Sequence, residues 1–192
     1  MMRRKLVLYS EQEESDTVAI DRRLLALIGK PRPCLGYIPS SGDTDRQYYQ
    51  ACRAYYAGLD ADLAVYFELD DKYDERLLDS LLSCDAIHLS GGNTFYFLHR
   101  LRSRNLVETL QHYVADGGVL IGVSAGAILM TPDIGTSSFC GDERLSGEQD
   151  DHGLALVDFA FAPHWGGLCT ATVSDLHDYA QRHNLTVYAC PD

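Results

Sequence analysis

Short apolar runs alternate along the chain with longer segments in which apolar residues recur every three or four positions. Runs of the first kind are typical of buried strands, and segments of the second kind are typical of amphipathic helices. The expected strands cover residues 6–9, 34–38, 63–69, 86–89, 119–123, 159–162 and 185–189. The expected helices cover residues 17–28, 44–57, 73–82, 94–101, 106–115 and 172–182. Asp43 or Thr44, and Thr94, are the expected N-caps of the second and fourth helices.

Alternation of strand and helix predicts an α/β fold, with a mostly parallel sheet and helices on both faces. No linker or internal repeat divides the sequence, so we expect residues 1–192 to form a single domain. Parallel strands end at one edge of the sheet, where such proteins build their sites. Polar, glycine-rich loops follow the expected strands at 40–43, 90–93, 124–126 and 163–165. The acidic segment 133–151 has no periodicity, and we expect it to cover or border the site.

Composition and charge exclude several classes of partner. The net charge of −12 repels a phosphate backbone, and Arg3-Arg4-Lys5 is the one basic cluster, so we expect no nucleic-acid partner. The apolar run after this cluster is too short for a secretion signal. No run approaches the ~20 apolar residues that span a membrane. We therefore expect a cytoplasmic protein with no membrane association.

Cysteine and histidine spacings predict neither a metal site nor a cofactor. The six cysteines form no C-x-x-C pair, and in a chain without an export signal they are expected to be reduced and mostly buried. The seven histidines show no H-E-x-x-H or comparable spacing. Sequence spacing cannot, however, reveal a site whose residues come together only in the folded chain.

The candidate chemistry begins at Gly122-Val123-Ser124-Ala125-Gly126, which directly follows an apolar strand. The pattern G-x-S-x-G is typical of a serine nucleophile on a tight strand-to-helix turn. A glycine turn that serves only close packing is an equally good interpretation of these five residues alone. The rest of the chain must decide between them.

A serine nucleophile needs a base and two N–H donors for the oxyanion. His164 is the best candidate base because it follows an apolar strand and Pro163, at the expected site edge. His152 is the alternative. Ala125 supplies one backbone donor by its position after Ser124, and the loop Gly91-Gly92-Asn93-Thr94 offers a second.

The acid of a Ser–His–acid arrangement stays open on the residues alone. The order Ser, His, acid leaves Asp192 at the end of the sequence. The order Ser, acid, His admits Asp133, Asp142, Glu143, Asp150, Asp151 and Asp158. Only 68 residues follow Ser124 (192 − 124), which is cramped for the α/β-hydrolase layout.

The motifs together resemble the aspartyl dipeptidase and cyanophycinase family of serine peptidases. The resemblance covers nearly the whole chain. It rests on Ile38-Pro39, Ser90-Gly91-Gly92-Asn93-Thr94-Phe95, Gly122-Val123-Ser124-Ala125-Gly126-Ala127, Pro163-His164 and Pro191-Asp192. It implies a flavodoxin-like or class I glutamine amidotransferase-like three-layer sandwich.

The resemblance also implies roles for individual residues. Ser124 corresponds to the nucleophile, His164 to the general base, and the N–H groups of Gly92 and Ala125 to the oxyanion donors. Asp192 stands where the family has a glutamate after proline. The family normally continues with a terminal hairpin that this sequence lacks. Its aspartyl dipeptidases also use a basic side chain after the histidine, whereas residues 165–178 contain no Arg or Lys, which argues against Asp-X specificity.

The expected function is therefore hydrolysis of short peptides through an acyl-enzyme on Ser124. Gly91, Asn93 and Trp165 are the expected substrate-pocket residues. The alternatives are an esterase or amidase with a non-peptide substrate, and a catalytically silent protein of the same fold that binds a small ligand. The expected partner is a small peptide, and the sequence is also compatible with a homodimer.

Overall fold

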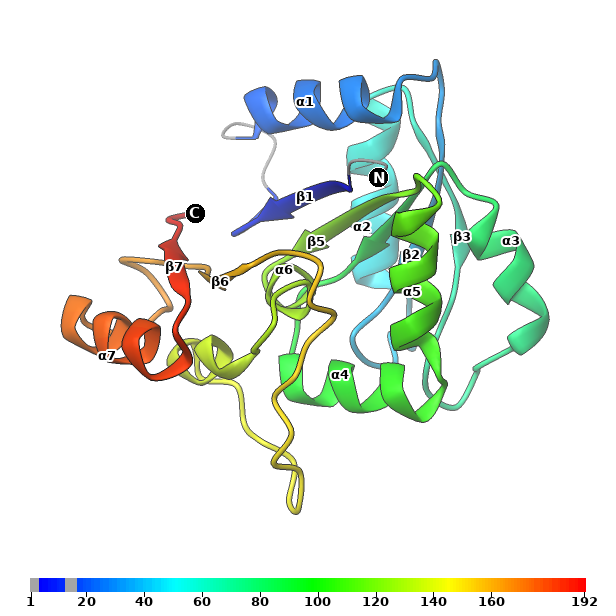
Figure 1. The fold of residues 1–192 in the computed structure, drawn as a ribbon. Coiled ribbons are helices and arrows are strands. Elements are labelled where there is room, and N and C mark those ends of the chain that lie inside the picture. The colour runs from blue at the N-terminus through cyan, green and yellow to red at the C-terminus, as the bar shows by residue number, and fades with distance from the viewer. Residues whose placement is uncertain (1–3, 13–16) are drawn as a thin grey trace.

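A five-stranded parallel sheet forms the centre of the molecule in the computed structural model, which describes residues 4–12 and 17–192. Arg3 of the basic cluster lies outside the described residues. The strands, in spatial order, are β1 (Lys5–Tyr9), β5 (Val119–Val123), β4 (Ala86–Leu89), β2 (Cys34–Ile38) and β3 (Asp62–Tyr66). Every neighbouring pair in this sheet is parallel (Figure 1).

Side chains alternate along the strands and build an apolar core on each face of the sheet. On β5, Val119 and Ile121 belong to the core that also contains Leu24 of α1 (Val18–Ile28) and Tyr56 of α2 (Gln47–Gly58). Leu120 belongs to the opposite core. That second core is covered by α3 (Leu78–Leu82), α4 (Thr94–Ser103), α5 (Leu106–Ala115) and α6 (Ala125–Leu129). Helices on both faces give three layers, which confirms the α/β fold expected from the strand–helix alternation.

The last two strands form a sheet of their own. β6 (Phe159–Ala162) pairs in parallel with β7 (Thr186–Ala189), and α7 (Val173–His183) connects them. Their carboxyl ends lie beside the end of β1, because the Ser10 hydroxyl contacts the Cys190 carbonyl at 3.1 Å. Figure 1 shows β7 and the C-terminus next to the tip of β1. This placement brings residues 163–164 and 190–192 to the same edge as Ser124.

Several element boundaries differ from the prediction. β3 ends at Tyr66 rather than at 69, because Phe67 and Leu69 are buried in a loop, in the same core as α4. The segment predicted as one helix over 73–82 is a 3₁₀ turn (Glu75–Leu77) followed by α3. A further 3₁₀ helix, η2 (Gly135–Cys140), lies in the acidic segment and was not predicted.

The predicted helix N-caps are wrong by one to three residues. α2 begins at Gln47 after Arg46, but the Asp43 carboxylate still accepts hydrogen bonds from the N–H groups of Gln47 and Tyr49. Asn93, not Thr94, caps α4, because its side chain accepts from the Tyr96 N–H at 2.9 Å.

Two other expectations concern the cysteines and the membrane. Cys84 and Cys169 are buried, whereas the other four cysteines are half-buried and all six are free thiols. Within residues 4–12 and 17–192, the helices are too short or too polar to cross a bilayer.

Candidate functional site

Ser124 lies on a strained turn between β5 and α6. Its backbone angles are φ 51° and ψ −110°, which non-glycine residues rarely adopt, and its N–H donates to the Tyr9 carbonyl at 3.0 Å. The flanking glycines permit close backbone contact. A Cβ on Gly126 would lie 2.2 Å from the Leu89 carbonyl oxygen, and one on Gly122 would lie 2.4 Å from the Gly126 carbonyl carbon. The turn therefore presents the Ser124 hydroxyl at the sheet edge, and only glycine fits at positions 122 and 126.

His164 links Ser124 to Asp192. Its Nε2 lies 2.9 Å from the Ser124 Oγ, and its Nδ1 lies 2.6 Å from the Asp192 Oδ1. The imidazole side chain is 10% exposed, whereas that of Asp192 is 38% exposed. A carboxylate on Nδ1 favours the tautomer with the proton on Nδ1, which leaves the lone pair of Nε2 facing the serine hydroxyl. Such an arrangement would allow Ser124 to act as a nucleophile, with His164 as its base and Asp192 to orient the imidazole.

Asp133, Asp142, Asp150 and Asp151, four of the six alternative acids, have other partners. Asp133 contacts Tyr179 and His183, and Asp142 accepts the Thr94 N–H at 2.8 Å. The alternative base, His152, is 90% exposed and pairs with Asp150 at 2.7 Å. Of the sequence candidates, the structure brings Ser124, His164 and Asp192 together.

Ser10 belongs to the same network and was missed by sequence reasoning. Its hydroxyl accepts the His164 N–H at 2.7 Å and lies 2.8 Å from the Asp192 Oδ1, to which it can donate. It thus ties the end of β1 to both the histidine loop and the acid, while His164 holds a positive φ of 58°. The available signal was its place directly after the first strand, at the edge where the other loops gather.

The two expected oxyanion donors lie in the loops around the serine. Among the described residues, neither the Gly92 N–H nor the Ala125 N–H donates to a protein acceptor. Gly92 has a φ of +131°, and a Cβ there would lie 2.0 Å from the Ser40 Oγ. A Cβ on Gly91 would lie 3.6 Å from the Ser124 Cβ, so this loop passes next to the serine.

A cavity of about 670 Å³ opens beside this network, and Ser124 and His164 line it. Gly91 also lines it, as expected for the pocket. Asn93 and Trp165 do not line it. The Asn93 side chain caps α4 and donates to the Glu143 carbonyl at 2.9 Å.

The cavity is acidic. Glu11, Asp43 and Asp45 line it, and no Lys or Arg of the described chain does. These acids were not predicted as site residues, although Asp43 stands in one of the loops that follow the strands. No residue of segment 133–151, which was expected to cover or border the site, lines the cavity. The segment instead contacts residues 93 and 94 through Glu143 and Asp142.

Cys140 is one of the thiols next to the histidine loop, and its Sγ lies 3.6 Å from the Pro163 carbonyl oxygen. Burial raises the pKa of this thiol to about 12, so it stays protonated near neutral pH.

The model of peptidase family S51 matches residues 6–192, which is nearly the whole chain. The chain belongs to peptidase family S51. The family resemblance inferred from the sequence motifs is thereby confirmed.

Individual relatives are similar over shorter stretches. An uncharacterized peptidase of Pasteurella multocida (strain Pm70) is 32% identical over 91 residues, which cover 47% of this chain and 44% of that protein. Peptidase E of Nostoc sp. (strain PCC 7120) is 34% identical over 83 residues, which cover 43% of this chain and 33% of that protein. The matched part of the chain thus spans less than half the length of these curated relatives.

A solved structure supports the fold over the whole chain. A crystal structure of a Listeria monocytogenes protein, provisionally described as a peptidase E, superposes with a TM-score of 0.73 and 20% sequence identity. The superposition covers 98% of this chain and 91% of that one. At this identity the likeness shows a shared fold, and the activity is argued from the site.

Proposed function

We propose that this protein is a serine peptidase that hydrolyses short peptides through an acyl-enzyme on Ser124. The observation that carries the proposal is the position of His164, whose two ring nitrogens contact Ser124 and Asp192. Membership in a peptidase family supports the same reaction class.

We assign each step of the reaction to a residue of this site. His164 Nε2 takes the proton from the Ser124 hydroxyl as Oγ attacks the peptide carbonyl carbon. The N–H groups of Gly92 and Ala125 stabilise the negative oxygen of the tetrahedral intermediate. His164 then returns the proton to the leaving amine, and the acyl-enzyme forms. Water, activated by the same Nε2, releases the acid product and restores Ser124.

The charges that line the cavity limit the range of peptides that it can bind. Glu11, Asp43 and Asp45 make the cavity negative, and no basic side chain of the described residues offsets them there. An acidic first residue of a peptide would meet like charge, which disfavours binding. We therefore propose short peptides with a neutral or basic first residue as substrates, rather than Asp-X dipeptides.

Labelling with a fluorophosphonate, which reacts with activated serines, tests the nucleophile directly. We expect stoichiometric labelling of the native protein at Ser124, and no labelling of Ser124→Ala or His164→Ala. Ser41→Ala is the matched control, because Ser41 is an exposed serine in the same cavity and its removal should leave labelling intact.

Turnover of a panel of dipeptides with acidic, neutral and basic first residues then tests the substrate. The acidic members are expected to have the lowest kcat/KM. Absence of both labelling and peptide turnover would contradict the proposed function, whereas a preference for Asp-X would contradict only the substrate.

A further inference from the structure

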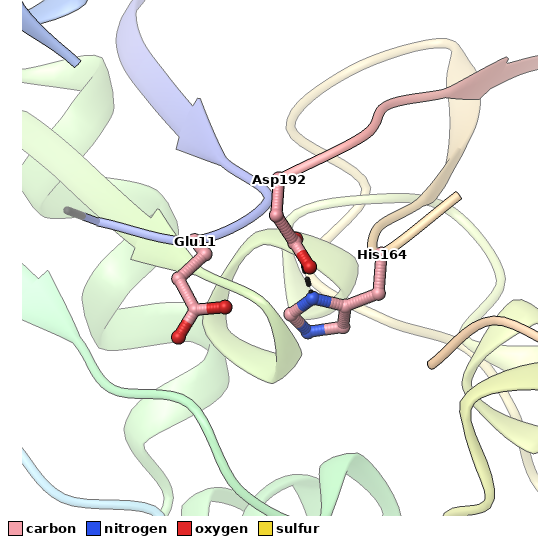
Figure 2. A group of neighbouring side chains, drawn as sticks. All are labelled: Glu11, His164 and Asp192. Carbon is pink, nitrogen blue, oxygen red and sulfur yellow. Dashed lines mark hydrogen bonds and ion pairs between the residues drawn. The ribbon is translucent and has the colours of Figure 1, made fainter. Parts of the chain in front are cut away.

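Glu11 faces the His164–Asp192 pair from the end of β1. Figure 2 shows its carboxylate directed toward the imidazole edge, with Asp192 on the neighbouring side. One ligand atom from each of the three residues lies within 4.8 Å of the other two. The three come from positions 11, 164 and 192, so no spacing in the sequence could indicate the cluster.

No Lys or Arg that the structure describes balances the charge of Glu11 in this cluster. Glu11 forms no salt bridge with any residue that the structure describes, and the carboxylates of Asp43 and Asp45 line the same cavity. A cleft lined by charges of one sign raises the local concentration of counter-ions. The cluster thus combines ligand atoms with a field that favours a cation.

We infer that Glu11, His164 and Asp192 bind one divalent transition-metal ion, of which Zn²⁺ is the best match. One imidazole and two carboxylates form a donor set of the kind that zinc accepts, with water as a fourth ligand. Zinc ligands lie about 2.0–2.2 Å from the ion. The ligand atoms must therefore draw together somewhat, which the exposed side chains of Glu11 and Asp192 permit. Mg²⁺ and Ca²⁺ prefer oxygen ligands and fit this set poorly.

Binding of the ion removes the base from the proposed peptidase, whichever ring nitrogen it takes. On Nε2 the ion displaces the hydrogen bond to Ser124. On Nδ1 it separates the imidazole from Asp192, and the remaining ring proton must then reside on Nε2, which can no longer accept the serine proton. This inhibition rests on the proposed function, but binding of the ion does not.

Calorimetric titration with ZnCl₂ tests the binding independently of catalysis. We expect one Glu11-dependent site in the native full-length chain and in Ser124→Ala. Glu11→Gln, which keeps the size of the side chain and removes its charge, should weaken the affinity roughly tenfold or more. Asp45→Asn is the matched control, because it removes an exposed charge from the same cavity outside the cluster; it weakens only the field and should lower the affinity much less than Glu11→Gln does. MgCl₂ at the same concentrations should give no such site.

The rate of fluorophosphonate labelling of Ser124 supplies a second measurement. Zn²⁺ should slow labelling of the native protein, and EDTA should restore the original rate. Glu11→Gln should require a correspondingly higher Zn²⁺ concentration for the same reduction in rate. Unchanged zinc affinity in Glu11→Gln, or no binding by the native protein, overturns the inference even if peptides are hydrolysed. A Glu11-dependent zinc site in a protein that never labels or hydrolyses peptides would instead contradict the proposed function and retain the metal site.

Discussion

At the scale of single residues, Ser10 is placed to position the histidine and the acid. Its hydroxyl receives the His164 N–H and reaches the Asp192 carboxylate. Ser10→Ala leaves that buried N–H without its acceptor and removes a donor from the acid, so the imidazole should lose its fixed orientation. We expect kcat to fall roughly 10–100-fold with little change in KM, because small displacements of a catalytic group have effects of this size. Steady-state kinetics on the preferred dipeptide measures both constants.

The control must separate orientation from loss of folded protein. Active-site titration with fluorophosphonate gives the fraction of competent molecules, and kcat is then expressed per labelled site. Ser10→Thr restores a hydroxyl and should recover part of the rate, while Ser41→Ala should match the native protein. A Ser10→Ala variant with native kcat per labelled site would show that the serine only helps the chain to fold.

At the scale of elements, the β5–α6 turn sets how closely α6 approaches β4. A Cβ on Gly126 would meet the Leu89 carbonyl at 2.2 Å, and backbone cannot move aside as a flexible side chain can. Gly126→Ala should therefore lower the free energy of unfolding by about 1–3 kcal/mol, as overpacking does, and abolish labelling of Ser124.

Gly58→Ala is the matched control for this substitution. Gly58 is the last residue of α2, and a Cβ there has no neighbour within 4 Å. Because alanine has the higher helix propensity, this variant should be as stable as the native protein or slightly more so. Urea unfolding of both variants measures the difference. Equal stability of the two would mean that Gly126 does not limit the approach of α6.

Elements could be predicted where one local rule decides them. β2, β4, β5 and β6 occupy the predicted residues because each is a short apolar run that ends at a polar loop. β3 was predicted too long, since the burial of Phe67 depends on a helix that is remote in sequence. For the same reason the pairing of β6 with β7 alone, outside the main sheet, has no local signal.

The site residues also differ in whether a local sequence pattern could predict them. Ser124 and the Gly91-Gly92 loop belong to motifs that the sequence displays directly. The contact of Ser10 with His164, and the placement of Glu11 near that residue, depend on how β1 and the β6–β7 sheet meet, which only the tertiary structure specifies.

At the scale of the whole molecule, a buried histidine couples stability to pH. His88 on β4 is 3% exposed, its ring stacks on Tyr37 with centroids 5.1 Å apart, and its Nδ1 lies 2.9 Å from the Tyr56 hydroxyl. Burial lowers the pKa of His88 to about 3, whereas the unfolded chain retains a value near 6.5. Between these values the unfolded state binds one proton more than the folded state. The stability contributed by neutral His88 is therefore fully present above pH 6.5 and is lost as the pH falls.

When the unfolded state binds one proton more, the free energy of unfolding changes by about 1.4 kcal/mol per pH unit. It should therefore fall by about 2 kcal/mol between pH 6.5 and pH 5.0. Most carboxyl groups titrate below this window, whereas histidines ordinarily titrate within it, so a variant without His88 is needed for comparison. Urea unfolding at pH 7.5, 6.5 and 5.0 measures the change for the native protein and for His88→Gln. The variant loses packing at every pH. Its free energy of unfolding, however, should fall less steeply with decreasing pH than that of the native protein, by up to about 1.4 kcal/mol per pH unit. The difference between the two proteins isolates His88, because every other titratable group is common to both. Parallel pH profiles would mean that His88 is protonated in the folded core, in conflict with its burial among tyrosines.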